Sequence, residues 1–436
     1  MIARGLLIVV LAGAARGAAG ETLTLGIDDA VARAVEASPR LARFRSLEAA
    51  ADAELRAARA GRLPEVELQA SYTRNSDVPE LSIPQPVGPP QVIFPNIPNN
   101  YGTRLGLALP LSAGGRISGR IAAGEDGRAA AEHDRRAALG DLVLEVKTAY
   151  WRLVTAREAA AVLGEAIKAF EAHLADSRNR ERFGMVARND VLAVQVERDG
   201  AELDRLRAES AAQVGEADLR RLLDLPPGTG VEPTEPLDEA LPTDEDLEAL
   251  VVEALAARAE RSSLASRARA ADAQADVERG ARLPQVSLGA GYDLARPNRE
   301  ILPPSDEWND TWDVGVRLSW SVFDGGRRSA GEARARAQAE AVRHQLAELD
   351  RAIRLEVTQQ LLERRTAGRG VEVAARALEA ARENRRVSAD RYREGVIASF
   401  ELLDAEVALE RAALDRTEAL ASLRLAGARL DRAIGR

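Results

Sequence analysis

The sequence contains no cysteine. Disulfides, thiolate metal sites, a cysteine nucleophile and a lipid on an N-terminal cysteine are therefore all excluded. The stability of the fold must come from packing instead of covalent cross-links.

Residue patterns for enzymatic chemistry are also missing. The three histidines, His133, His173 and His344, lie far apart on predicted helices. The chain has neither a glycine-rich phosphate loop nor a paired-histidine zinc motif. We expect these histidines to serve packing or solvation, and we predict no enzyme activity, no catalytic residue, no metal site and no cofactor.

The sequence has no excess of positive charge. Lys and Arg total 60 against 69 Asp and Glu, which gives a formal net charge of −9. An acidic balance argues against a nucleic-acid partner, because the phosphate backbone attracts basic surfaces.

The N-terminal apolar run, residues 6–15, is shorter than the roughly 20 residues that a membrane-spanning helix needs. Arg4 precedes this run, and small residues at 17–20 follow it, which is the layout of a secretory signal peptide. We predict a signal peptide at residues 1–20, cleaved after Ala19 or Gly20, and export of the mature chain. The alternative is a buried N-terminal helix.

The sequence is internally duplicated. The triplet Arg62-Leu63-Pro64 before one alternating segment returns as Arg282-Leu283-Pro284 before another. The triplet Gly114-Gly115-Arg116 likewise returns as Gly325-Gly326-Arg327. A repeat this long means two copies of a large unit, and each copy predicts the order helix, strand, strand, long helix, turn, helix.

Most of the chain is predicted to be helical. Residues 116–183 contain no proline, and a continuous helix of that length would be roughly 100 Å long. Apolar residues within the long segments step by three and four. They are Leu139, Val143, Val146, Tyr150 and Leu153 in the first copy, and Phe400, Leu403, Val407 and Leu414 in the second. This pattern indicates antiparallel coiled-coil hairpins.

Four segments alternate instead between apolar and polar residues. They begin at Val66, Thr103, Val286 and Thr311 and run for roughly ten residues each, which matches the strands of outer-membrane barrels. Each copy therefore supplies one β-hairpin. Four strands cannot close a barrel, so the protomers must pool theirs as eight in a dimer or 12 in a trimer. Small residues on the polar side, such as Gly289 and Gly315, favour the trimer with an open lumen.

Aromatic residues are only 3% of the chain, yet they gather in the strand regions. Five lie near predicted strand ends: Tyr72, Tyr101, Tyr292, Trp312 and Trp320. We interpret them as membrane-interface aromatics, because these rings favour the boundary between hydrocarbon and water. The alternative is a general preference of aromatics for strands.

Prolines crowd the loop of the first hairpin, residues 78–98. We expect that this stretch cannot pair as a strand or form a helix, and that it is an extracellular surface loop. The shorter loop of the second hairpin, residues 295–310, has the same expected role.

The ordered set of motifs resembles the TolC-type outer-membrane efflux channels over essentially the whole mature chain. Besides the paired triplets, the matching marks are the turns at 182–192 and 391–406. The resemblance implies a mainly helical protein with transmembrane β-structure: a homotrimer with a 12-stranded barrel and a 12-helix periplasmic tunnel. It also implies localisation in the outer membrane, contact with outer-membrane lipid, and a periplasmic adaptor and inner-membrane pump as partners.

The expected domains follow from the duplication. The first repeat covers residues 21–230, with a β-hairpin at 64–111 and a helical hairpin at 116–223. The second covers 247–436, with a β-hairpin at 284–323 and a helical hairpin at 327–433. Residues 224–246 are expected to wrap around the middle of the tunnel as an equatorial connection, with a flexible linker as the alternative.

The helical turns are the candidate functional region. Gly184 and Gly395 mark the two reversals, where glycine can adopt a left-handed conformation. The resemblance places Glu401 and Asp404 at the periplasmic aperture, where three copies would form acidic rings. The alternative is that they are solvated acids near a helix N-terminus, a position that favours negative charge.

The resemblance also implies a gating link between the two turns. Asp190 and Tyr392 occupy the matching positions for a hydrogen bond. An arginine that other members carry two residues after the turn glycine is Ile397 here, and Arg188 or Arg393 are the candidates to replace it.

The function predicted from the sequence is the outer-membrane exit duct of a tripartite efflux or type I secretion system. A periplasmic coiled-coil adaptor or scaffold without a barrel is the alternative. The exported substrate is not encoded in any recognisable motif.

Overall fold

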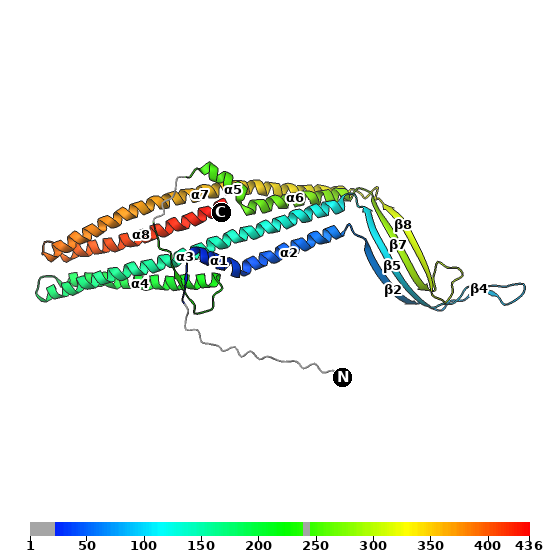
Figure 1. Ribbon diagram of the computed structural model, residues 1–436, viewed down its shortest axis with the longest axis horizontal. Helices are drawn as coiled ribbons and strands as arrows, with labels where there is room; N and C mark the ends of the chain where they lie inside the picture. The colour runs from blue at the N-terminus through cyan, green and yellow to red at the C-terminus, as the bar shows by residue number, and fades with distance from the viewer. Residues whose placement is uncertain (1–21, 239–244) are drawn as a thin grey trace, which may run out of the picture. The chain divides into compact units, whose positions relative to one another are not determined.

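The computed structural model describes residues 22–238 and 245–436. The expected signal peptide at 1–20 and part of the expected connection at 224–246 lie outside these residues. The helices and strands follow in the predicted order in both copies (Figure 1), which confirms the internal duplication.

The first copy contains β1 (Thr22–Leu25), α1 (Ile27–Ala37), α2 (Pro39–Ala60), β2 (Glu65–Arg74), β3 (Leu81–Ile83), β4 (Gln91–Phe94), β5 (Asn99–Ser112), α3 (Arg116–Arg182), α4 (Arg188–Leu222) and β6 (Gly230–Pro233). The second contains α5 (Leu247–Ala257), α6 (Ala259–Gly280), β7 (Gln285–Arg296), β8 (Asn309–Ser319), α7 (Arg327–Arg393) and α8 (Ser399–Ile434).

The long helices are continuous, as predicted. Helices α3 and α7 each contain 67 residues. Both begin directly after a glycine pair in the left-handed region, for example Gly114 at φ 62° and Gly115 at φ 85°. A Cβ on Gly114 would lie 2.5 Å from the carbonyl oxygen of Gly280, so only glycine fits where the end of α6 passes this turn.

None of the helices in the described part of the chain combines the length and the apolar character needed to cross a bilayer.

The strands form one antiparallel sheet in the order β2-β5-β7-β8. The predicted hairpins β2–β5 and β7–β8 are both present, and β5 pairs with β7 to join them. Strict alternation divides the sheet into an apolar face and a polar face. Tyr72 lies opposite Tyr101, and Tyr292 lies opposite Trp312, all on the apolar face.

The proline-rich loop corrects one prediction. We expected no strand within residues 78–98, but β3 and β4 pair there as a small antiparallel ribbon. The reason is that both strands are free of proline: Pro84, Pro86, Pro89 and Pro90 lie in the connection between them. Proline therefore determines where this ribbon turns, and leaves the flanking residues free to pair.

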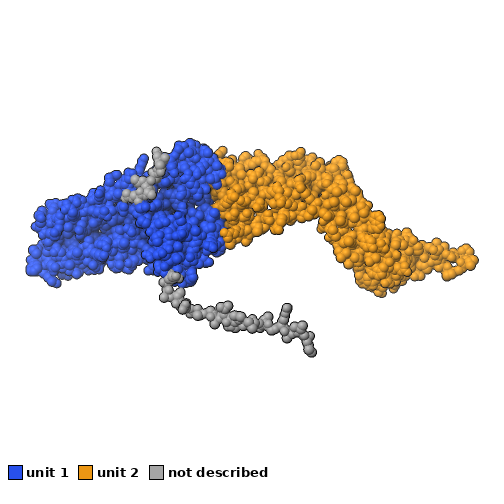
Figure 2. All heavy atoms as spheres, in the orientation of Figure 1, with its two compact units in different colours: residues 1–41, 138–257, 353–436 blue, residues 42–137, 258–352 orange. Residues whose placement is uncertain are grey.

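The chain divides into two compact units (Figure 2). One comprises the described residues within 1–41, 138–257 and 353–436, and the other comprises residues 42–137 and 258–352. Helices α3 and α7 contribute to both. The second unit holds the sheet, α2 and α6, and in it α3 approaches α6 closely at Gly119, where an added Cβ would lie 2.8 Å from Val277.

Tyr150 of α3 belongs to the first unit, and its side chain is fully buried. Its hydroxyl donates to the carbonyl of Leu25 at 3.1 Å and accepts from the backbone N–H groups of Thr234 and Glu235 at 3.2 and 3.1 Å. These bonds attach the parallel pair β1–β6 to the long helix. The sequence did not indicate this pairing, which places part of residues 224–246 in a strand.

Candidate functional site

Both helical reversals have the same backbone geometry. Gly184 has φ 71° and Gly395 has φ 72°. At each turn the glycine N–H and the next N–H bond back to the last helical carbonyls, at 2.8 and 3.0 Å in the first turn and 3.1 and 2.9 Å in the second. Glycine is needed here because other residues strain in the left-handed region.

The two acids expected at the aperture lie at the start of α8 and are both exposed. Glu401 accepts a hydrogen bond from the backbone N–H of Ala398 at 3.2 Å, so its carboxylate also caps its own helix. Asp404 makes no hydrogen bond or ion pair to any residue that the structure describes. Of the two carboxylates, only that of Glu401 is engaged in a hydrogen bond within the described chain.

Asp190 and Tyr392, the expected latch residues, make no hydrogen bond to each other in the described chain. The Asp190 carboxylate accepts from the side-chain amide of Asn189 at 3.2 Å. Tyr392 is 4% exposed, and its hydroxyl finds no hydrogen-bond partner among the described residues. Arg393 pairs with Asp390 on its own helix, and Arg188 is exposed at the start of α4.

A buried polar network joins the two helical hairpins near these turns. His173 of α3 lies 2.8 Å from a carboxylate oxygen of Glu406 and 3.0 Å from the hydroxyl of Ser399, both on α8. The carboxylate can only accept, so Nδ1–H of the imidazole donates to Glu406, while Nε2 lies within hydrogen-bond distance of the Ser399 hydroxyl. The His173 and Glu406 side chains are 1% and 4% exposed.

Aromatic and cationic groups surround this network. The Tyr392 ring lies edge-on to His173 with ring centroids 5.4 Å apart. The guanidinium of Arg180 lies 4.2 Å from the Tyr392 ring centroid, and Arg385 reaches a Glu406 oxygen at 3.7 Å. Residues of α3, α7 and α8 thus meet in one cluster, which we call the polar tie.

Sequence reasoning missed the polar tie. It assigned His173 to packing or solvation and placed Phe400 in the heptad stripe of α8. Phe400 is instead 56% exposed, whereas Leu403 of the same predicted stripe is buried, together with Ser399 and Glu406. The signal was present: Ser399, Glu406 and Glu410 follow the three-and-four spacing of a core position, where charged residues are rare unless they are paired.

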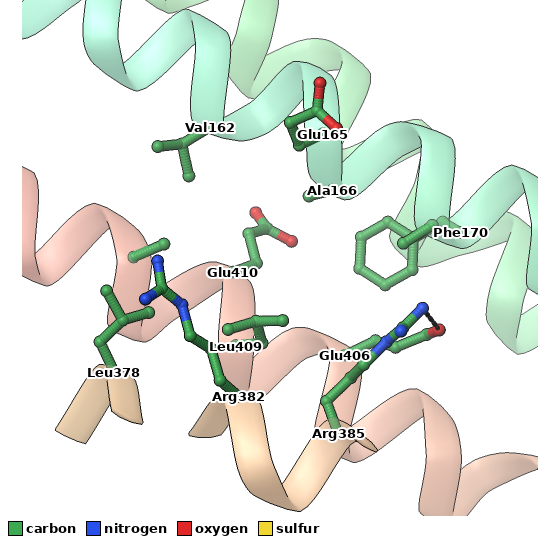
Figure 3. Close-up of a pocket in the computed structure, with 12 residues that line it drawn as sticks. Val162, Glu165, Ala166, Phe170, Leu378, Arg382, Arg385, Glu406, Leu409 and Glu410 are labelled. Carbon is green, nitrogen blue, oxygen red and sulfur yellow. Dashed lines mark ion pairs between the residues drawn. The ribbon is translucent and has the colours of Figure 1, made fainter. Parts of the chain in front are cut away.

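A cavity of about 300 Å³ lies beside the polar tie, between α3, α7 and α8. Figure 3 shows the Glu410 carboxylate between Arg382 on one side and Phe170 on the other. Burial raises the pKa of Glu410 above its usual range, and the charges of Asp204 and Glu197 on α4 raise it further. Neither Glu410 nor Arg382 forms an ion pair within the described chain.

The five interface aromatics all lie exposed in the sheet region. Tyr72 and Tyr101 stack with ring centroids 5.1 Å apart, near the loop end of their strands. Trp320 lies just beyond β8 at the helical end, where its indole N–H donates to the Arg282 carbonyl at 3.1 Å. The aromatic residues thus occur at two levels of the sheet, separated by aliphatic positions.

Comparison with known proteins identifies the architecture. A family model described as outer membrane efflux protein matches residues 30–224 and 250–436. The outer-membrane channel OprN shares the fold with a TM-score of 0.79 at 21% identity, over 94% of this chain and 89% of that one. The outer membrane protein VceC of Vibrio cholerae aligns with a TM-score of 0.78 at 19% identity, over 94% of this chain and 96% of that one.

One curated relative also matches. Protein CyaE of Bordetella pertussis is 29% identical over 154 residues. This match covers 35% of the present chain and 32% of the relative, so the aligned segment spans about a third of that protein's length.

The polar tie generates a first prediction. Glu406→Ala leaves the His173 N–H without its acceptor in a buried site, so we expect a loss of stability of about 2–3 kcal/mol. Thermal unfolding and trypsin digestion of the purified protein measure it, with Asp404→Asn on the same helix as the exposed control. An equal melting temperature for Glu406→Ala and the control would contradict the structural role of the tie.

Glu410 generates a pH-dependent prediction. Its pKa is raised in the folded state, so the protonated form favours folding at low pH and this contribution is lost as the pH rises through the folded pKa. Glu410→Gln should therefore raise the melting temperature at pH 8 by about 1–2 °C, and the gain should vanish below about pH 4.

The matched control for Glu410 is Glu165→Gln in the same cavity, because Glu165 is exposed and pairs with Lys168 at 2.7 Å. It should give no pH-dependent gain. A Glu410→Gln protein that is no more stable than wild type at pH 8 would refute the argument from burial.

Proposed function

Because the chain belongs to the outer membrane efflux protein family, we propose that it forms the outer-membrane exit duct of a tripartite efflux or type I secretion system. In this proposal it accepts substrate from a periplasmic adaptor and an inner-membrane pump. The cargo is small molecules, metal ions or proteins, and the chain carries no residue pattern that selects among them.

The observation that carries the proposal is the exposed apolar face of the sheet. Trp312, Val314, Val316 and Leu318 on β8 are 63–74% exposed in the protomer. A continuous apolar surface of this kind is costly in water and is stabilised by contact with lipid. The aromatics at its two levels match the two interfaces of a bilayer.

The edges of the sheet support assembly of several copies. Strands β2 and β8 each pair on one side only within the described chain. Unpaired backbone groups are too costly in hydrocarbon, so these edges must pair with further strands. Three protomers would supply the 12 strands of a barrel with an open lumen.

The helices also present surfaces for a homotrimer. Along α4, exposed apolar residues recur at helical spacing: Leu192, Val196, Leu203, Leu206 and Val214. Helix α7 has a comparable set in Leu355, Leu362 and Val373. Coiled coils bury stripes of this kind. In a ring of three protomers, the stripe on α4 of one protomer would pack against the stripe on α7 of the next.

A periplasmic scaffold without a barrel is the second candidate. The helical hairpins would suit it equally well. It leaves the exposed face and open edges of the sheet without a partner, so the exit duct is the better explanation. Heat-modifiable migration on gels and recovery in the outer-membrane fraction are expected for the duct, and the absence of both would favour the scaffold.

We further propose that Glu401 and Asp404 form acidic rings at the periplasmic aperture. Their exposure at the start of α8, next to the turn at Gly395, supports this placement. Three copies of each carboxylate would attract cations and bind multivalent cations most strongly.

Recording in planar bilayers tests both the channel and its aperture. The purified protein should form stable channels that trivalent cations block from the periplasmic side. In Glu401→Gln/Asp404→Asn, the half-blocking concentration should rise about tenfold or more, because the ring charge is removed. Glu394→Gln, an exposed acid in the turn itself, is the control and should change little; equal effects in both proteins would contradict the rings.

The latch between Asp190 and Tyr392 is also part of the proposal. The Tyr392 hydroxyl is buried without a partner in the described protomer, which costs about 1–3 kcal/mol. A rearrangement that brings it to Asp190 would recover this free energy, so a closed aperture has a physical basis that does not need the arginine missing at Ile397.

Single-channel recording of Tyr392→Phe and Asp190→Ala tests the latch. Each substitution removes one hydrogen-bonding group, and both should increase the open probability to a similar extent. Asn189→Ala is the control for a general effect at the start of α4. Unchanged gating in both latch proteins would exclude the latch and leave the channel proposal intact.

A further inference from the structure

The polar face of the sheet carries a charged cluster that spans three strands. Arg104 on β5 lies opposite Asp293 on β7, and Asp313 on β8 lies opposite Gly291 on β7. Alternate residues share a face, so the three charged side chains project from the same side of the sheet. They come from both copies of the duplicated unit.

The arginine bridges the two acids. One terminal nitrogen of Arg104 donates to an oxygen of Asp293, and the other donates to an oxygen of Asp313 at 2.8 Å. The guanidinium therefore reaches across the whole width of β7. Its two donors face outward in the fork geometry that suits two carboxylates.

Glycine makes room for this bridge. A Cβ on Gly291 would lie 2.3 Å from the Arg104 terminal nitrogen and 2.6 Å from the Asp313 carboxylate oxygen, so any side chain there would displace the bridge. The neighbouring polar-face positions towards the helices, Gly106, Gly289 and Gly315, also lack side chains. The cluster consequently stands above a flat glycine surface.

The cluster is open to solvent and unbalanced in charge. Arg104 and Asp313 have side chains 44% and 58% exposed, against 27% for Asp293. Arg104 and Asp293 also line a polar cavity of about 350 Å³ together with Ser71, Asn100 and Asn298. Two carboxylates share one guanidinium, which leaves one negative charge per protomer, centred on the more exposed Asp313.

We propose that this cluster is a charge-selective band inside the barrel, with Asp313 as the residue that favours cations and Arg104 as the residue that limits this preference. The inference rests on the proposed function, because the polar face lines the lumen only if the apolar face contacts lipid. The adjoining positions towards the helices, Gly106, Gly289 and Gly315, are glycines, and Gln69 beside Arg104 on β2 is uncharged. Three copies of the cluster therefore supply the charged side chains that a passing ion meets at this level.

A purely structural role is the competing explanation. In that case the bridge only holds β5, β7 and β8 together, and removing either partner weakens the sheet in the same direction. A charge-selective band predicts a different result. Removing the charge of Asp313 and removing the charge of Arg104 should change the ion preference in opposite directions. The sign of the two effects therefore separates the explanations.

The test measures reversal potentials of the purified channel in planar bilayers under a potassium chloride gradient. Asp313→Asn should lower the permeability ratio of potassium to chloride by about twofold, and Arg104→Gln should raise it by about as much. Asp310→Asn is the matched control. It removes the same charge from the same strand but from the apolar face, opposite Leu294.

The measurements are repeated in the Glu401→Gln/Asp404→Asn protein, so that the charge of the aperture acids does not hide the effect of the cluster on ion selectivity. Opposite shifts for the two cluster substitutions, with none for the control, support the inference. Shifts of the same sign, or none in a conducting channel, overturn it and leave the proposed function standing. A wild-type protein that forms no channel would instead overturn the proposed function itself.

Discussion

The unpaired edges and the apolar face of the sheet are the constraint on which the rest depends. Strands β2 and β8 each lack a neighbour within the described chain, and the exposed face carries aromatic and branched side chains. Water solvates the edges but not the face, whereas lipid solvates the face but not the edges. In the proposed function, both demands are met together when several protomers close their sheets into one barrel within a membrane.

The duplicated chain meets this constraint with few kinds of element. In each copy a glycine pair ends the sheet and starts a helix of 67 residues, and a left-handed glycine reverses it. The intrinsic helix propensity of its residues stabilises a single helix only slightly, so a helix of this length depends for its stability on packing against neighbouring helices. The polar tie at His173 and Glu406 provides such a contact near the turns, beside the apolar cluster that contains Phe170, Leu174 and Leu403.

Alternation predicted the four main strands, and the absence of proline predicted the long helices, because both properties are local. The ribbon β3–β4 was missed since the prolines around it masked two short segments that are free of proline. The parallel pair β1–β6 and the polar tie were missed for a different reason. They join residues far apart in sequence, and a lone histidine or glutamate in a helix does not reveal its partner. Phe400 and Ser399 differ by one position, yet tertiary contact decides which is buried.

The differences between the copies are where specific chemistry can arise. Tyr72 and Tyr292 are equivalent, so Gly291 and Asp293 of the second copy stand where the first has Ser71 and Thr73. With Ser71 at the position of Gly291, the bridge from Arg104 would be displaced, so a cluster of this kind can form across β7 but not across β2. In the same way Ser399, which bonds His173, stands where the first copy has Arg188 at the start of its helix. The duplication therefore explains the shared backbone, and each of these two polar features depends on residues that are present in one copy only.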